Sequence, residues 1–281
     1  MPELPEVEVI KKSIVKTVTN QTVTGVWTSK FKMRSQVRLY ELKKLVGKRV
    51  LKVFRRAKFL VLEFDNFWLL THFGMSGRLI EASESDEKVH IRNNLKHIHF
   101  SISLGSVELF LQDYRRFGGL RLLEKKNEHS KLEDFDVLSL GIEPLSDCFS
   151  SESLFKLTRS INRPIKNFLM DGKYISGLGN IYVTEALFRA GIHPMAISSR
   201  LGKIRCSRLC TSIKTVLIEA IKSGGSTLKD FSSTKGEKGK YINMHLVYGK
   251  KLKPCPICNI SLSSISISQR TSIYCKKCQL K

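Results

Sequence analysis

The stretch VLKVFRRAKFLVLEFDNFWLLTHF, residues 50–73, sets the architecture of the first half of the chain. It contains three strand-sized apolar runs separated by basic or turn-forming residues, and two more runs of this kind follow it. The five runs are Val50–Phe54, Phe59–Phe64, Phe67–Thr71, His97–Leu104 and Val107–Gln112. Short runs of this kind, split by Gly, Asn or Asp, predict an antiparallel β-sandwich or barrel over residues 20–123.

The apolar residues follow the period of a helix on both sides of this region. Residues 5–19 begin with Pro5, which suits a first helical turn, and then place apolar residues at helical spacing. The second half of the chain contains four stretches with the same spacing: 151–160, 164–171, 181–190 and 206–222. We therefore expect an α+β protein with an N-terminal antiparallel β-sandwich and a helical second half.

The charge of the chain points to its partner. Forty-eight Lys and Arg residues against twenty-five Asp and Glu residues leave a net charge of +23. So much like charge favours a polyanionic partner, and a nucleic acid explains it better than an inert basic surface does. A membrane surface is the alternative, but the sequence shows no strongly basic amphipathic helix and no apolar stretch of bilayer-spanning length.

The N-terminal residues and the cysteines predict a cytoplasmic protein. Met1–Val9 carries three glutamates and no basic residue, which is the reverse of a secretory or transit signal. Seven cysteines in a reducing compartment argue against a disulfide framework. Three of them, Cys148, Cys206 and Cys210, are scattered, and we expect them to be small core residues.

The other four cysteines form two Cys-x2-Cys pairs, sixteen residues apart: Cys255 with Cys258, and Cys275 with Cys278. Four thiolates at this spacing suit tetrahedral coordination of one structural zinc ion. Residues 261–268 and 270–274 predict a β-hairpin too small to fold alone, so metal binding would supply about 10–16 kcal/mol of its folding energy. A redox role for either pair is disfavoured because no helix follows it.

These patterns divide the chain into four predicted parts. We expect an N-terminal β-sandwich domain with its leading helix over residues 1–130 and a linker over 131–150. A helical domain is expected over 151–243 and a zinc finger over 244–281.

The first residues, Met1-Pro2-Glu3-Leu4-Pro5-Glu6, admit two interpretations. They are a suitable acidic, proline-marked start for a helix. They also offer chemistry, because removal of Met1 would expose the secondary amine of Pro2. An α-amino group titrates near 8, so more of it is neutral and nucleophilic at neutral pH than of a lysine. Attack of this amine on a sugar C1′ gives an iminium that acts as an electron sink, and Glu3 is placed to shuttle protons.

Several strings resemble formamidopyrimidine-DNA glycosylases, in register from residue 2 to residue 279. The strings are MPELPEVE at the N-terminus, RRAK at 55–58, HFGMSG at 72–77, KHIH at 96–99, DYRRFG at 113–118, GLGNIY at 177–182, GGSTLKDF at 224–231, VYG at 247–249 and the QRTSIYC-x2-CQ ending. The resemblance implies a β-sandwich joined to a helix-two-turn-helix domain and a β-hairpin zinc finger.

The resemblance also implies the catalytic residues. Pro2 matches the family's Schiff-base nucleophile and Glu3 its proton donor. Lys58 matches the lysine that assists β-elimination, and Arg270 the finger arginine linked to δ-elimination. A solvated lysine and a phosphate-binding arginine are the simpler alternatives for the last two.

Six more residues match DNA-contacting positions of the family. Met75 resembles the methionine that fills the gap left by an extruded nucleotide, while Arg115 and Phe117 resemble the pair that engages the opposite strand. The other three are His97, Lys166 and Asn180. Core packing is the alternative for Met75 and Phe117, helix capping for Asn180, and a structural role for His97.

The implied function is a bacterial DNA repair enzyme. It would excise formamidopyrimidines, or 8-oxoguanine opposite cytosine, from double-stranded DNA as a monomer, and then cleave the abasic site by β- and δ-elimination. An endonuclease VIII-like enzyme would instead act on oxidised pyrimidines, but Leu4 and the Met75, Arg115 and Phe117 set favour the purine enzyme. A non-catalytic zinc-containing DNA-binding protein would leave the N-terminal string unexplained.

Some positions depart from the family's pattern. Tyr114 stands where proline is frequent, and Thr184 replaces the usual acidic or small residue before Glu185. The segment 232–245 resembles the loop that closes over the extruded base, but it carries lysines where proline and an aromatic residue are common. The preference between 8-oxoguanine and formamidopyrimidines therefore stays open.

Overall fold

The computed structural model describes residues 2–83, 85–127, 129–132, 140–226 and 239–281. The chain divides into two compact units, each with its own core. The first unit comprises Met1–Phe135 and Ser223–Lys240, and the second comprises Asp136–Lys222 and Tyr241–Lys281. No helix in these described ranges is long and apolar enough to cross a membrane.

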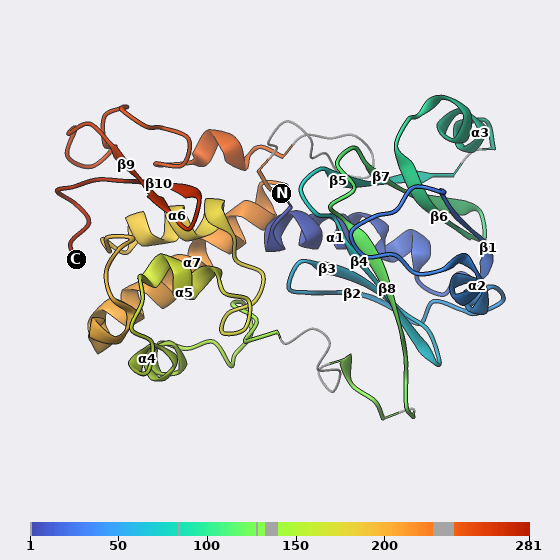
Figure 1. Ribbon diagram of the computed structural model, residues 1–281, viewed down its shortest axis with the longest axis horizontal. Helices are drawn as coiled ribbons and strands as arrows, with labels where there is room; N and C mark the ends of the chain where they lie inside the picture. The colour runs from blue at the N-terminus through green and yellow to red at the C-terminus, as the bar shows by residue number, and fades with distance from the viewer. Residues whose placement is uncertain (1, 84, 128, 133–139, 227–238) are drawn as a thin grey trace. The chain divides into compact units, whose positions relative to one another are not determined.

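Two four-stranded antiparallel sheets form the first unit (Figure 1). One sheet has the order β2-β3-β4-β8, with strands β2 (Lys52–Arg56), β3 (Phe59–Glu63), β4 (Phe67–His72) and β8 (Gly119–Glu124). The other has the order β1-β6-β7-β5, with strands β1 (Val23–Thr28), β6 (Ile98–Leu104), β7 (Val107–Asp113) and β5 (Gly77–Ala82). Leu62, Leu69 and Leu111 belong to one core shared by both sheets. The predicted antiparallel β-sandwich is confirmed.

Helix α1 (Leu4–Val18) packs on β2 and β3 of the first sheet. Its buried residues Val7, Ile10 and Ile14 recur at helical spacing, which confirms the helix predicted over 5–19. Glu3 is the N-cap, and the side chains of Glu3 and Glu6 form a reciprocal capping box. The helix therefore begins directly after Pro2 and Glu3.

The region expected to be strand-like also contains three short helical segments: α2 (Leu39–Leu42), η1 (Lys43–Leu45) and α3 (Ser85–Asn94). Helix α3 is largely polar, and its Ile91 packs with Ala82 and Phe110 of the second sheet. The sequence did not reveal this helix because its two apolar residues, Val89 and Ile91, do not form an apolar stripe.

The described residues of the second unit form four α-helices and a β-hairpin. The helices are α4 (Ser151–Arg159), α5 (Ile165–Met170), α6 (Asn180–Arg189) and α7 (Lys203–Lys222), with 3-10 turns η4 (Ser198–Arg200) and η5 (Tyr241–Met244). The four predicted helices are confirmed, with ends displaced by three residues at most. The hairpin, β9 (Ser263–Ile267) with β10 (Arg270–Tyr274), lies beside α6 in Figure 1.

Candidate active site and nucleic-acid interface

Pro2 and Glu3 are both buried at the start of α1 in the first unit, and only 2% of Glu3 is exposed. The Glu3 backbone N–H donates to Oε2 of Glu6 at 2.8 Å, which fixes the backbone one residue after Pro2. The structure thus places the predicted nucleophile beside the predicted proton donor, on the rigid end of a helix.

Glu6 also connects this helix to a segment more than two hundred residues away. Its Oε1 accepts a hydrogen bond from the Ser226 backbone N–H at 2.8 Å. Gly225 adopts φ +80°, and a Cβ at that position would lie 3.0 Å from the same oxygen. Residues 225 and 226 are thereby held against α1, in a role for Glu6 that the sequence did not single out. Residues 232–238 of the predicted base-closing loop lie outside the described residues.

Lys58 lies in the turn between β2 and β3, where its charge acts on His72 at the end of β4. Burial, together with the positive charges of Lys58 and Arg34, lowers the pKa of His72 to about 4. The Gly74 backbone N–H donates to Nδ1 of His72 at 3.0 Å, so the neutral ring carries its proton on Nε2. His72 opens onto a hollow of about 400 Å³ that Arg34 and Arg121 also line. The sequence did not identify His72 as a site residue.

The lowered pKa of His72 predicts that the first unit loses stability in mild acid. The unfolded histidine takes up a proton near pH 6.5 and the folded one near pH 4, so the stabilisation is complete above pH 6.5 and is lost as the pH falls towards 4. Between pH 7 and pH 5 this effect amounts to about 2 kcal/mol. Urea unfolding followed by fluorescence of Trp27 and Trp68, both in the first unit, measures it.

The His72→Gln variant is expected to remove the part of this pH dependence that His72 causes and to leave the part from His99, whose pKa burial also lowers. His90→Gln on the exposed surface of α3 should retain the full pH dependence. An unchanged pH dependence in His72→Gln would show that another group is responsible.

Three predicted DNA-contacting residues lie on two adjoining loops of the first unit. Met75 is 42% exposed in the turn between β4 and β5, and Phe117 is 41% exposed in the loop between β7 and β8. The guanidinium carbon of Arg115 lies 4.6 Å from the centre of the Phe117 ring. A Cβ on Gly74 would lie only 2.3 Å from the backbone nitrogen of Gly118, so the two loops touch. The structure therefore brings Met75, Arg115 and Phe117 together as exposed groups.

His97 is exposed just before β6, and its backbone adopts φ +67°. Its ring lies 4.8 Å from the ring of Tyr114, which is 54% exposed. An imidazole and a phenol thus form an aromatic pair next to Arg115 in the sequence. The unusual Tyr114 takes part in this pair.

Lys166 and Asn180 of the second unit both hold the β9–β10 hairpin. Lys166 is only 1% exposed, and its ammonium donates to Ser272 Oγ at 2.5 Å and to the Thr271 carbonyl at 3.4 Å. Asn180 Nδ2 donates to the same carbonyl at 3.2 Å. The N-cap of α6 is Gly179 rather than Asn180, which corrects the capping alternative. In this structure Lys166 has no exposed ammonium to offer DNA, whereas Arg270 is exposed at the start of β10.

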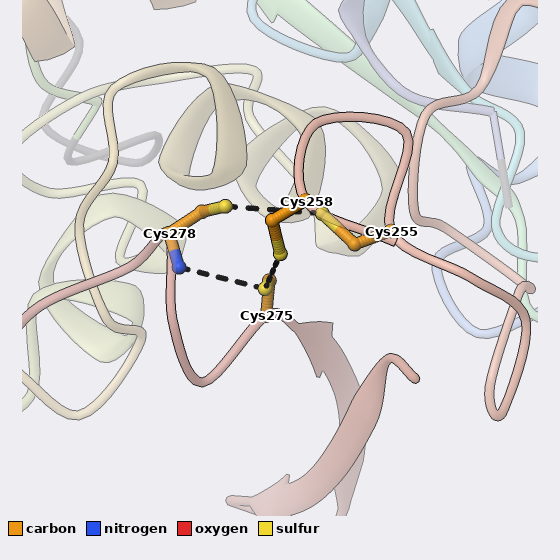
Figure 2. Close-up of side chains that lie close together, drawn as sticks. All are labelled: Cys255, Cys258, Cys275 and Cys278. Atoms are coloured by element: carbon orange, nitrogen blue, oxygen red, sulfur yellow. Dashed lines mark hydrogen bonds between the residues drawn. The ribbon is translucent and has the colours of Figure 1, made fainter. Parts of the chain in front are cut away.

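The four predicted metal ligands converge (Figure 2), and their sulfur atoms all lie within 4.8 Å of one another. Cys255 Sγ lies 3.9 Å from Cys278 Sγ, and Cys258 Sγ lies 3.4 Å from Cys275 Sγ. Tetrahedral zinc with Zn–S bonds of about 2.3 Å needs sulfur separations of about 3.8 Å. The donor set and its spacing therefore fit one zinc ion.

A buried carboxylate holds the segment of chain that leads to these cysteines. Glu185 on α6 is 0% exposed, and it accepts three backbone N–H bonds at 2.7–3.0 Å, from Leu246, Val247 and Tyr248. These three hydrogen bonds stabilise the buried negative charge, and they fix the backbone of residues 246–248, shortly before Cys255. Nothing in the sequence around Glu185, where only Thr184 was unusual, predicted this role.

Comparison with known proteins decides the family. Residues 1–120 match the formamidopyrimidine-DNA glycosylase N-terminal domain, and residues 140–232 match the formamidopyrimidine-DNA glycosylase H2TH domain. The formamidopyrimidine-DNA glycosylase of Haemophilus influenzae (strain 86-028NP) is 40% identical over 281 residues, which cover 99% of each chain. The chain belongs to the formamidopyrimidine-DNA glycosylase family. It is a DNA glycosylase and acts in DNA repair.

Solved structures of relatives carry DNA. A Lactococcus lactis FPG mutant in complex with a Fapy-dG containing DNA is 31% identical, with a TM-score of 0.88 and full coverage of both chains. The wild-type L. lactis Fpg (MutM) with an oxidized pyrimidine containing DNA is also 31% identical, with a TM-score of 0.86 and the same coverage. These likenesses agree with the predicted helix-two-turn-helix architecture, and they support DNA binding by the glycosylase.

Proposed function

We propose that this glycosylase excises oxidised purines, formamidopyrimidines and 8-oxoguanine opposite cytosine, and then cleaves the abasic site. The observation that carries the proposal is the placement of Pro2 and Glu3, buried together at the capped start of α1. Once Met1 is removed, the Pro2 nitrogen is a secondary amine whose position is set by a helix rather than by a flexible terminus.

The amine attacks C1′ of the damaged nucleotide and gives up its proton, the N-glycosidic bond breaks, and the base leaves with its bonding electrons and takes up a proton. Glu3 donates a proton to the sugar as its ring opens. The resulting iminium withdraws electrons from C1′, so a proton leaves C2′ and the 3′ phosphate departs in β-elimination. Lys58 assists this proton transfer, and Arg270 assists the δ-elimination that releases the 5′ phosphate. Hydrolysis of the iminium frees Pro2.

The exposed set Met75, Arg115 and Phe117 supports extrusion of the damaged nucleotide. Extrusion costs a few kcal/mol, and apolar groups that occupy the vacated stack reduce this cost. An arginine stacked on an aromatic ring suits the acceptors of the orphaned cytosine. The contact of the His97 ring with Tyr114, the neighbour of Arg115, allows His97 to join this surface. We assign Lys166 and Asn180 to holding the finger in place for DNA.

We propose one structural zinc ion on the four cysteines, monomeric action on double-stranded DNA, and a cytoplasmic location. The zinc supplies folding energy to the hairpin that carries Arg270. The converged sulfur atoms support the metal site, and the charge of +23 supports DNA as the partner.

Oxidised pyrimidines are a second class of candidate substrate, because the L. lactis relative was crystallised with DNA containing one. Duplexes with 8-oxoguanine opposite cytosine and with thymine glycol opposite adenine separate the two classes. Faster cleavage of the thymine glycol duplex would reverse the preferred assignment.

Borohydride trapping tests the nucleophile. Reduction of the iminium with borohydride is expected to give a covalent protein–DNA adduct that mass spectrometry locates on Pro2. The Pro2→Gly variant should yield far less adduct, because a primary amine forms an imine that can lose its proton. Pro5→Ala, which alters the other proline of the same helix start, should trap as well as the unmodified chain. An adduct on a lysine, or no adduct with any lesion, would contradict the proposed chemistry.

A further inference from the structure

A single buried carboxylate connects the two loops that carry Met75, Arg115 and Phe117. Asp113, the last residue of β7, is 0% exposed. Its Oδ1 accepts a hydrogen bond from Ser76 Oγ at 2.6 Å, and its Oδ2 accepts one from the Gly118 backbone N–H at 2.7 Å. Ser76 follows Met75 directly, while Gly118 follows Phe117, so one carboxylate restrains both loops.

Arg115 belongs to the same network through its backbone. Its N–H lies 3.1 Å from Ser76 Oγ and 3.3 Å from Oδ1 of Asp113. The two residues that would engage the orphaned strand are therefore tied to the residue that follows Met75. Hydrogen bonds to a buried carboxylate are stronger than bonds between neutral groups, and the loss of an acceptor leaves buried donors unsatisfied.

Close packing reinforces these bonds. A Cβ on Gly118 would lie 2.7 Å from the His72 carbonyl oxygen and 3.0 Å from Asp113 Oδ2. The Asp113 backbone is itself fixed, because its N–H donates to the His97 carbonyl at 3.0 Å and its carbonyl lies 3.1 Å from His99 Nε2. The two loops and the end of β7 form one block with little freedom to move separately.

We propose that Asp113 is a positioning residue that makes nucleotide extrusion a single concerted event. This inference rests on the proposed function. Asp113 is buried and touches no substrate; it acts by holding Met75, Arg115 and Phe117 at a fixed spacing before DNA arrives. Insertion of Met75 then brings Arg115 and Phe117 to the orphaned base without a further ordering cost.

The Asp113→Asn variant tests this coupling. An amide has one acceptor oxygen, so either Ser76 and Arg115 or Gly118 must face an NH2 group. Single-turnover cleavage of an 8-oxoguanine duplex is expected to slow by about 10-fold or more. Cleavage of a preformed abasic site should slow by less than about 3-fold, because that site costs less to extrude. The fluorescence rise of 2-aminopurine placed next to the lesion should fall in parallel with the 8-oxoguanine rate.

Ser76→Ala removes one hydroxyl from the network and should slow 8-oxoguanine cleavage more than abasic-site cleavage, though by less than Asp113→Asn. This variant tests the proposal even if Asp113→Asn does not fold. Ser106→Ala, in the exposed turn between β6 and β7, is the matched control. Equal slowing on both substrates, or an unchanged 2-aminopurine signal, would overturn the positioning role. Failure of the proposed function would look different, since the unmodified chain would then give no trapped adduct.

Discussion

Removal of the proposed zinc ion from the cluster of Cys255, Cys258, Cys275 and Cys278 is expected to unfold the β9–β10 hairpin and abolish DNA cleavage. Ile273 of the hairpin packs in a small core with Leu262 and Phe188. Two of the four cysteines, Cys255 and Cys275, are fully buried in the same core. Binding of structural zinc supplies about 10–16 kcal/mol in comparable fingers, far more than these contacts replace. Arg270, at the start of β10, would lose its fixed position.

Hydrogen exchange with mass spectrometry, before and after chelation, measures this effect. Peptides covering residues 254–280 should lose protection, while peptides from α4 and α7 should keep it. A Cys275→Ser variant should behave like the chelated protein, and Cys148→Ser should not. Cys148 lies outside the cluster and is exposed, so the prediction that it is a core residue is wrong, whereas Cys206 and Cys210 are buried as predicted. Full protection of the hairpin amides in protein shown to be free of metal would contradict the proposal that metal binding keeps the hairpin folded.

Glu185→Gln is expected to destabilise the second unit by about 3 kcal/mol or more. Three backbone donors, from Leu246 to Tyr248, converge on a carboxylate with no exposed surface. A glutamine has one acceptor oxygen, and its NH2 group would face at least one of these donors. The chain leading into Cys255 would lose its anchor, so metal affinity should fall as well.

Circular dichroism during urea unfolding measures the loss of stability. Hydrogen exchange of the amides of residues 246–248 measures the loss of their hydrogen bonds to Glu185. Glu152→Gln places the same substitution on the exposed first turn of α4 and should alter unfolding far less than Glu185→Gln. Equal midpoints for Glu185→Gln and the unmodified chain would show that the carboxylate is replaceable.

Periodic patterns predicted the regular structure well. The apolar runs from Val50 to Gln112 became five strands of the sandwich, whereas β1, β5 and β8 were not singled out. The four helical stretches became α4 to α7. The sequence did not predict helix α3, because its buried residue Ile91 is not part of an apolar stripe. The division into four parts by residue number stays a prediction.

Long-range polar contacts could not be predicted in the same way. The spacing of the cysteines revealed the metal site because all four ligands lie within 24 residues. Asp113 and Glu185 gave no such signal, since their partners are set by tertiary contacts, across 37 positions from Ser76 and 61 positions to Leu246. Lys166 was assigned to DNA because it matches a DNA-contacting position of the family, and only the tertiary structure shows that its ammonium is hydrogen-bonded to the hairpin.

The bond between Glu6 and Ser226 has a consequence for biosynthesis. Domains form from the N-terminus as the ribosome proceeds, so both sheets can assemble while the helices are still being translated. The partner that completes the Glu6 cap arrives only after α7 has been made. In a nascent chain the start of α1 therefore lacks its Ser226 partner until residues 1–226 have been translated.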